Sequence, residues 1–266
     1  MSDNTKRVAV DSVVKNFESP IKHTLDSFNI KSEELSNLTG DGVSICMLDT
    51  GVVEHKSVKK AHNYVNFTND PNADFVSHAT MMAGIISGND KKNLIGLAPD
   101  ANVYYCKIVD DTCKIKFDSI VAGVLWGVIK EVDIIFVPFV TEIEHHSLLT
   151  AINKAYNSNI FIIAPVGNEK TVSYPAKYDK VLSVGCYDAS GSLADFSSNG
   201  NFNVKGTNIP TAYKDNSYAV VSGTSMASAV ATSVCARVIQ NYKSQGIKYN
   251  NSMIFNEMKK LSPFSI

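Results

Sequence analysis

A serine at the start of an apolar, helix-like segment is the first residue of this sequence that could do chemistry. Residues 223–228 are Gly-Thr-Ser-Met-Ala-Ser, and small apolar residues follow them. Serine and threonine in such a place often cap a helix, because their oxygens accept hydrogen bonds from the free amides of the first turn. Ser225 could instead be a nucleophile, but a serine hydroxyl needs a base within hydrogen-bond reach. That interpretation requires a histidine and a carboxylate elsewhere in the chain.

Among the six histidines, His78 has the best place for a general base. It begins the apolar helix expected at 78–87, so its ring would project from the helix N-terminus. Asp49 ends a strand of buried type, where an unpaired carboxylate is costly, and an imidazolium would suit it as a partner. His55 is expected to be structural in its loop. Four further histidines lie in polar surroundings and are expected on the surface: His23, His62, His145 and His146.

Apolar strand-like segments alternate with helix-like segments along the chain. Strands are expected at 43–48, 102–109, 133–140, 159–166 and 180–186, and helices at 78–87, 117–132, 146–158 and 225–243. This alternation predicts a single three-layer α/β domain, with a mostly parallel sheet covered by helices on both faces. Ligands bind such sheets beyond the carboxyl ends of the strands, which is where Asp49 would lie.

Three motifs in order, MLDTGV at 47–52, SHATMMAG at 77–84 and SGTSMAS at 222–228, resemble the subtilisin-like serine proteases. The resemblance implies a serine endopeptidase in which Asp49 orients His78, His78 is the general base and Ser225 is the nucleophile. It also implies that Asn168, in APVGNE, lines the oxyanion hole. Residues 41–266 would form the peptidase domain and residues 1–40 an N-terminal extension, a layout similar to that of intracellular members.

The expected substrate-binding edges depart from the family pattern. Where the family has Ser-Leu-Gly-Gly, this chain has Pro-Phe-Val-Thr at 138–141. Val140 replaces a glycine at the wall of the main specificity pocket, which predicts narrow specificity and a preference for small residues before the cut. The substrate-binding residues that the resemblance implies are Pro138, Phe139, Val140, Cys113, Lys114, Ile115 and Gly167. No cofactor is expected, and calcium is disfavoured because the family's aspartate ligand is replaced by Ser57.

The composition of the 266-residue chain bounds its partners and its compartment. It has 44% hydrophobic residues, 19% charged residues and a formal net charge of -1, so we expect a peptide or protein substrate, no nucleic acid and no membrane. Five cysteines without a C-x-x-C pair fit a reducing compartment better than a secreted one. No signal peptide or 18-residue apolar stretch is present, which predicts a cytoplasmic location, with secretion left open.

Two other functions are consistent with parts of the sequence. An aspartic protease also has a D-T-G motif, but it needs two such carboxylates, and this chain has one. A subtilisin-like scaffold that binds peptides with little or no hydrolysis stays an alternative, because both substrate edges are rebuilt. Residues 1 to about 25 are a candidate self-occluding strand or docking arm, since a cytoplasmic protease needs restraint.

Overall fold

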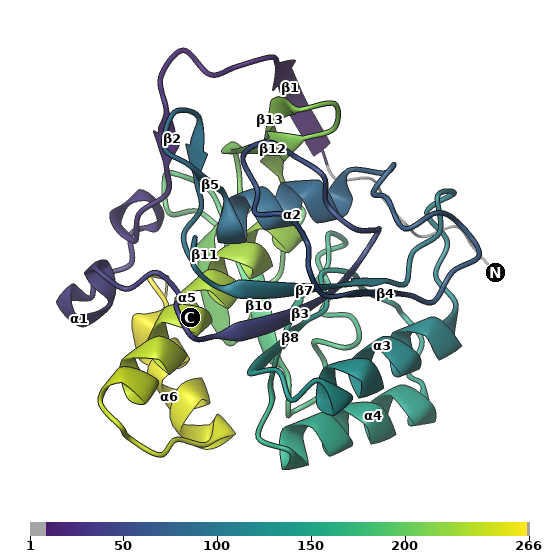
Figure 1. Ribbon diagram of the computed structural model, residues 1–266. Coiled ribbons are helices and arrows are strands. Elements are labelled where there is room, and N and C mark those ends of the chain that lie inside the picture. The colour runs from purple at the N-terminus through teal and green to yellow at the C-terminus, as the bar shows by residue number, and fades with distance from the viewer. Residues whose placement is uncertain (1–8, 265–266) are drawn as a thin grey trace.

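The computed structural model of this protein describes residues 9–264, and its centre is a seven-stranded parallel sheet (Figure 1). The strand order is β11-β10-β9-β8-β3-β7-β4, and each neighbouring pair is parallel. In that order the strands are Phe202–Lys205, Leu182–Tyr187, Phe161–Pro165, Ile134–Phe136, Ser44–Asp49, Asn102–Lys107 and Tyr64–Asn66. Since all strands run the same way, their carboxyl ends meet at one edge, the usual place for a ligand in such folds.

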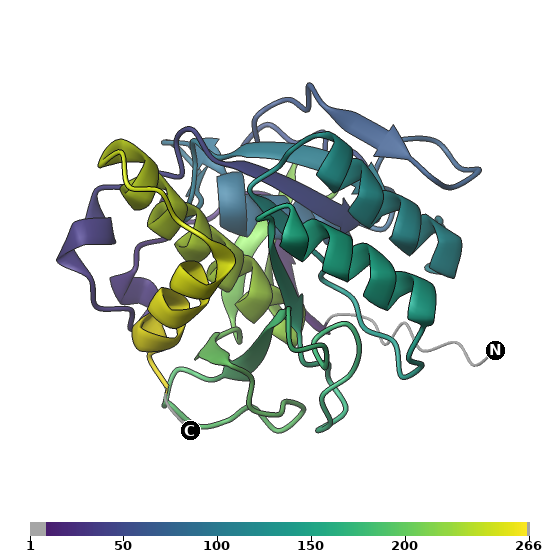
Figure 2. The same cartoon turned by 90° about the horizontal axis from the view of Figure 1, so that it is seen from below.

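Helices cover both faces of the sheet, as the sequence pattern predicts (Figures 1 and 2). On one face pack α2 (His78–Ser87) and α5 (Thr224–Ser244), with α6 (Asn251–Leu261) against α5. On the other face α3 (Phe117–Ile129) and α4 (His146–Asn157) lie side by side, which Figure 2 shows clearly. The prediction of a three-layer α/β fold with a parallel sheet is confirmed.

Strand β3 shows how the sequence divides the core into two halves. Ile45 and Met47 belong to the cluster that includes α2 and α5, whereas Cys46 and Leu48 belong to the cluster that includes α3 and α4. All four side chains are fully buried. Successive side chains of a strand point to opposite faces, so an unbroken apolar run fills both clusters. The run ends at Asp49, which places one carboxylate at the ligand-binding edge of the sheet.

Short elements flank the central sheet on the α2 side (Figure 1). Strand β1 (Ala9–Val14) pairs antiparallel with β13 (Ser217–Ser222), which pairs with β12 (Ile209–Tyr213). Strand β2 (Ile21–Lys22) pairs with β6 (Leu94–Ile95), and β6 pairs with β5 (Asn89–Asp90). A 3₁₀ turn (Asp26–Phe28) and α1 (Glu33–Ser36) follow β2. The four apolar side chains that this part of the chain adds to the core are Leu25, Phe28, Ile30 and Leu35.

The candidate self-occluding arm is only partly visible. Residues 1–8 lie outside the described residues, and the structure shows the rest of the arm, which includes β1 and β2. The pairing of β1 with β13 places Ala9 opposite Ser222 and Val10 opposite Val221. The arm therefore borders the strand that leads to Ser225, while its occluding role stays a prediction.

Two expected elements end three or more residues earlier in the structure than their sequence patterns do. The strand expected at 133–140 stops at Phe136, although the Val137 amide still donates to the Ile163 carbonyl at 3.0 Å. Pro138 has no N–H to continue the ladder, so the chain leaves the sheet there. The helix expected at 117–132 ends at Ile129, and Glu131 takes a left-handed φ of 51°.

The prediction that His23 lies on the surface is wrong. The residue is 4% exposed, and its Nε2 donates to the carbonyl oxygen of Pro210 over 2.9 Å. Burial lowers the pKa of His23 to about 4, although the hydrogen bond opposes this shift. Its partner lies 187 residues away in sequence, which is why local polarity misled the prediction. Of the other histidines expected on the surface, two are exposed and one is half-buried: His62, His146 and His145, respectively.

Candidate active site

Asp49 and His78 form a hydrogen-bonded pair at the carboxyl edge of the sheet. Asp49 is the last residue of β3 and is 2% exposed, and His78 is the first residue of α2. The ring Nδ1 lies 2.8 Å from Oδ1 and 3.0 Å from Oδ2 of the carboxylate. The amide of Thr50 also donates to Oδ1, at 2.7 Å. A ring that donates through Nδ1 keeps Nε2 as its basic nitrogen, which is the tautomer that a general base requires.

The surroundings of His78 favour its charged form. Burial by itself lowers the pKa of the ring. The charge of Asp49, its hydrogen bond to the ring and the charge of Asp74 outweigh burial, so the pKa of His78 lies above its ordinary value. A nearby carboxylate stabilises an imidazolium in this way. The two carboxylates therefore stabilise the imidazolium that forms when the ring takes up a proton.

Ser225 lies in the first turn of α5 and is 7% exposed. Its hydroxyl donates to the carbonyl oxygen of Pro138 over 3.0 Å, and not to an atom of its own helix. The N-cap of α5 is Gly223, which has no side chain to accept a bond. Capping therefore does not describe Ser225. In this structure the partner of the hydroxyl is Pro138 and not His78. In serine enzymes the hydrogen bond between the nucleophile and its base often tightens only when substrate is bound.

Asn168 is anchored against the start of α5. Its Oδ1 accepts hydrogen bonds from the amide of Thr224 at 3.1 Å and from the Thr224 hydroxyl at 2.8 Å. A backbone N–H needs an acceptor, so these bonds assign the oxygen and leave Nδ2 as the donor group of the amide. A Cβ placed on Gly223 would lie 3.8 Å from Nδ2, so this nitrogen is beside the helix N-terminus. Donors at a helix N-terminus stabilise negative charge.

The segment at 138–141 lies close to the Asn168 motif. The amide of Thr141 donates to the Tyr174 carbonyl at 2.8 Å, and the Tyr174 amide donates back at 2.9 Å. Gly167 has a φ of 104°, and a Cβ placed on it would lie 3.4 Å from Cγ2 of Val140. The valine side chain therefore faces the open side of Gly167. This brings two of the predicted substrate-binding residues together.

The second predicted substrate-binding edge lies in a turn after β7. Asp110 shapes this turn, because its Oδ1 accepts hydrogen bonds from the amides of Thr112 and Lys114, both at 2.9 Å. Cys113 takes a φ of 64°, and Ile115 pairs with Val109 in an antiparallel bridge. The role of 113–115 in substrate binding stays a prediction.

The sequence did not reveal a buried lysine near the site and its ion pair with Asp111. Lys107, which pairs with Asp49 in register on β7, is fully buried. Its Nζ donates to the carbonyl of Thr50 at 2.7 Å and to Asp111 at 2.7 Å. The sequence did not reveal Asp74 either, whose charge helps to raise the pKa of His78. This residue lies in a polar loop without a periodic pattern. A carboxylate four residues before His78 was the only local signal for it.

The residues around Ser57, which stands where the family has its aspartate calcium ligand, bond to one another. The Ser57 hydroxyl donates to Asp90 at 3.1 Å and lies 2.7 Å from the Tyr218 hydroxyl. Asp90 also accepts a hydrogen bond from Asn93 at 2.6 Å. Among residues 9–264, no group of three or more His, Cys, Asp or Glu side chains is arranged to hold a metal ion. Within the same residues, no helix has both the length and the apolar character to cross a membrane.

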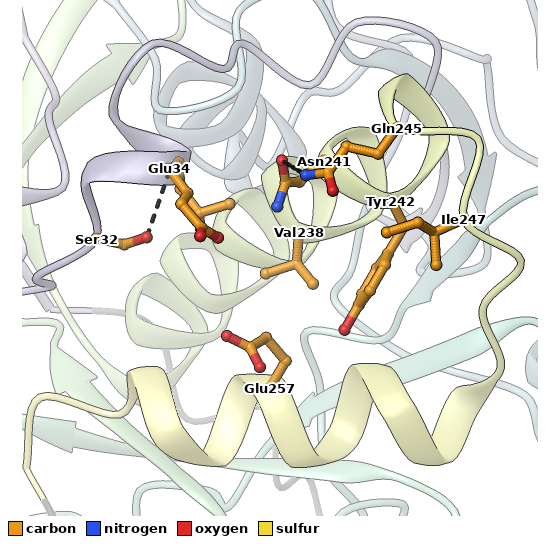
Figure 3. A pocket seen from close by; sticks show the side chains of 9 residues that line it. Ser32, Glu34, Val238, Asn241, Tyr242, Gln245, Ile247 and Glu257 are labelled. Atoms are coloured by element: carbon orange, nitrogen blue, oxygen red, sulfur yellow. Dashed lines mark hydrogen bonds between the residues drawn. The ribbon is translucent and has the colours of Figure 1, made fainter.

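A separate cavity of about 190 Å³ lies between α1, α5 and α6 (Figure 3). Asn241 and Tyr242 in the last turn of α5 line it, together with Gln245 at the C-cap of that helix. Ser225 lies at the other end of the same helix. With a rise of about 1.5 Å per residue, Ser225 and Asn241 are roughly 24 Å apart along the helix axis. The cavity is thus distinct from the Asp49–His78 site.

Comparisons with known proteins show similarity over most of the chain. The subtilase family model matches residues 40–261. The chain is 31% identical over 254 residues to the minor extracellular protease Epr of Bacillus subtilis, covering 92% of this chain and 38% of that protein. It is 28% identical over 266 residues to a thermostable alkaline protease of Halalkalibacterium halodurans, covering 96% and 73%. Subtilisin DY of Bacillus licheniformis is 29% identical over 215 residues, covering 76% and 78%.

Proposed function

The chain belongs to the subtilase family of subtilisin-like serine proteases, and we propose that it hydrolyses internal peptide bonds through Asp49, His78 and Ser225. The observation that carries the proposal is the hydrogen-bonded pair of Asp49 and His78 at the carboxyl edge of the sheet, where Ser225 in the first turn of α5 donates to Pro138 just beyond β8. The matched region spans 38% and 73% of the length of the first two relatives, so the proposal concerns the present chain and not the whole of a longer protein.

Each side chain has one task in this reaction. The Ser225 oxygen attacks the peptide carbonyl carbon while its proton passes to Nε2 of His78, and Asp49 stabilises the resulting imidazolium. The oxyanion is stabilised by Nδ2 of Asn168 and the Ser225 amide. His78 then protonates the leaving amine, and water releases the acyl group by the reverse path.

Attack requires the Ser225 hydroxyl to exchange its partner. It now donates to the Pro138 carbonyl, and it must turn to His78 to be deprotonated. Pro138 has a carbonyl but no N–H, so it can accept a bond from the backbone of a bound peptide. A peptide that occupies this carbonyl frees the hydroxyl for His78.

A fluorophosphonate probe tests the proposal directly. The wild-type protein is incubated with the probe, digested, and analysed by mass spectrometry, with Ser225→Ala as the control. Labelling of Ser225, together with cleavage of a peptide library that the Ser225→Ala variant does not cleave, is the expected result. Absence of both labelling and cleavage in the wild-type protein would refute the proposal.

A second candidate, a subtilisin-like scaffold that binds peptides with little hydrolysis, is favoured by the Ser225–Pro138 hydrogen bond, which keeps the hydroxyl from His78. The same experiment separates the two functions. A scaffold binds library peptides without cutting them and leaves Ser225 unlabelled. Sensitivity to pepstatin would instead indicate an aspartic protease.

Val140 narrows the pocket for the residue before the cut. Its support is the approach of the Val140 side chain to Gly167, since a side chain that fills this space must displace the valine methyl groups. Alanine or serine is preferred there, and phenylalanine and tyrosine are disfavoured. Val140→Gly should increase cleavage after aromatic residues about tenfold or more. The reason is that it removes a steric cost of about 1–3 kcal/mol when a large side chain enters the pocket. Peptide-library profiling measures this, with the exposed neighbour Ile143→Ala as the control. A wild-type preference for aromatic residues would contradict it.

A cytoplasmic setting belongs to the same proposal. Its support is that four cysteines, Cys46, Cys106, Cys186 and Cys235, are buried and carry free thiols. Free thiols persist in reducing compartments. Cell fractionation with an antibody to the protein tests the location.

A further inference from the structure

We propose that Asp74 is a positioning residue that holds Asp49 and His78 in their reactive arrangement and stabilises the charged form of the His78 ring. The inference rests on the proposed function and adds a second, half-buried carboxylate to its site. Asp74 lies in the loop between β4 and α2, four residues before His78. The catalytic mechanism described above gives it no task.

One oxygen of Asp74 joins the two segments that carry the reactive pair. Its Oδ1 accepts hydrogen bonds from the Thr50 hydroxyl at 2.7 Å and from the Ser77 amide at 2.8 Å. Thr50 directly follows Asp49, and Ser77 directly precedes His78. A single carboxylate oxygen is thus bonded to the neighbour of each member of the pair. Displacement of Asp74 would change the geometry between them.

The other oxygen of Asp74 caps α2. The N-cap residue Ser77 has a left-handed φ of 73°, and among the described residues its buried hydroxyl has no hydrogen-bond partner. Oδ2 of Asp74 accepts from both the amide and the hydroxyl of Thr80 at 2.7 Å. The Ala79 amide in turn donates to the Thr50 hydroxyl oxygen at 3.0 Å. The first turn of α2 is therefore tied to the loop after β3, and a cap of this kind fixes a helix start.

The hydrogen bonds of Asp74 fit its ionised form. All four are donated to it, whereas a protonated carboxyl would have to donate one. Burial raises the pKa of Asp74, and the donated bonds oppose this shift. The titratable groups near it are Asp49 on β3, His78 on α2, and Tyr105 and Lys107 on β7. Burial raises the pKa of Tyr105, which keeps that phenol neutral.

The charge of Asp74 acts on His78 in a predictable direction. A carboxylate stabilises the imidazolium, so Asp74 raises the pKa of His78, in addition to the larger effect of Asp49. Lys107 is the opposite charge nearby, and its ammonium is bonded to Asp111 and to the carbonyl oxygens of Thr50 and Ala73. Removal of the Asp74 charge should therefore lower the pKa of His78.

Asp74→Asn tests both parts of the proposal. It preserves the shape of the side chain, removes its charge and replaces one acceptor by a donor. The His78 pKa, measured by NMR titration of the ring, is expected to fall by about half a pH unit or more. The ring signal is identified by its absence in His78→Gln. For the peptide substrate, kcat is expected to fall about 10- to 100-fold with KM nearly unchanged, because the reacting groups and not the binding edge are displaced.

Asp100→Asn is the matched control. It removes the same charge at the opposite end of β7, where Asp100 pairs with Lys59 at 2.9 Å. The His78 titration and kcat should equal those of the wild-type protein. Thermal unfolding of each variant confirms that the folded state is being compared.

A second pair of variants covers the case in which Asp74→Asn does not fold. Thr50→Val removes the hydroxyl that bridges Asp74 and Ala79, while Thr50→Ser keeps it. We expect kcat to fall about tenfold in the valine variant and to be restored in the serine variant. Equal rates in the two Thr50 variants would refute the positioning role.

An unchanged His78 titration in folded Asp74→Asn would overturn the proposal, whatever the rate. The titration needs no hydrolysis, so it tests Asp74 even if the wild-type protein neither cleaves nor labels. Absence of cleavage and labelling in the wild-type protein would refute the proposed function, but the effect of Asp74 on the His78 pKa would still be measured.

Discussion

At the scale of single residues, the hydrogen bonds of Asn168 distinguish between two roles for this side chain, stabilising the oxyanion and binding the substrate. Its oxygen is occupied by both donors of Thr224, so only the amide nitrogen is available to a ligand. A carboxamide held in this way can donate to developing negative charge without rearranging, and such preorganised donors contribute in the transition state more than in the bound substrate.

Asn168→Leu should therefore lower kcat with little change in KM. The expected loss is about 10²-fold or more, a magnitude known from subtilisin itself for the loss of one such donor. Steady-state kinetics on a library-derived peptide provides the measurement. A raised KM with normal kcat would make Asn168 a substrate-binding residue instead.

His23 gives the molecule a defined acid sensitivity. Its folded pKa is about 4, against 6.5 for the ordinary ring, so between these values the unfolded chain binds a proton that the folded chain does not. Stability should fall as the pH drops from 6.5 towards 4, by about 3 kcal/mol from this residue. His23→Gln, which keeps a donor for Pro210, should weaken the pH dependence of the thermal midpoint. Exposed His62→Gln is the control, and equal slopes in all three proteins would contradict the prediction.

At the scale of elements, β1 and β13 connect the N-terminal arm to the reactive serine. β13 ends at Ser222, three residues before Ser225, and β1 forms its outer neighbour. Three apolar β1 side chains are exposed, namely Val10, Val13 and Val14. The strand therefore buries little apolar surface, and its backbone pairing holds it in place. A weakly buried strand can detach at low cost, as a restraining arm requires.

Deletion of residues 1–14 should raise the initial rate of peptide hydrolysis and lower the thermal midpoint modestly. The rate should rise because the candidate occluding arm is removed, and stability should fall because β13 loses its neighbour. Progress curves with a fluorogenic peptide measure the first effect. Deletion of residues 1–8 alone shows whether β1 is needed to restrain hydrolysis. Unchanged rates in both truncated proteins would show that the arm has only a structural role.

At the scale of the whole molecule, the hydrogen bonds of Ser57 and Asp90 bear on metal dependence. Protein donors already satisfy the Asp90 carboxylate, and Ser57 is a weaker calcium ligand than a carboxylate. Excess EDTA should therefore leave the thermal midpoint unchanged within a degree or so, with added calcium as the matched comparison. A fall of several degrees that calcium reverses would show that the fold holds the ion.

The overall fold could be predicted from the sequence because its central strands are apolar without interruption, as residues 45–48 show. The hairpin of β12 and β13 was missed. Its turn contains Asp215 and Asn216, which take φ values of 56° and 55°. Asp and Asn are common in hairpin turns because they tolerate such positive φ values. Asp74 and His23 could not be found in this way. Their environments depend on contacts between distant segments, which local polarity does not reveal.

The alternation of β3 between two cores limits how this protein can change its length. Insertion of a single residue between Ile45 and Leu48 would exchange the side chains of the two clusters and turn the carboxylate of Asp49 away from His78. An insertion in the exposed turn at Asp215 would disturb neither cluster. Lineages of this protein should therefore accumulate insertions and deletions at such turns, while the β3 segment keeps a fixed length even where its apolar residues are exchanged.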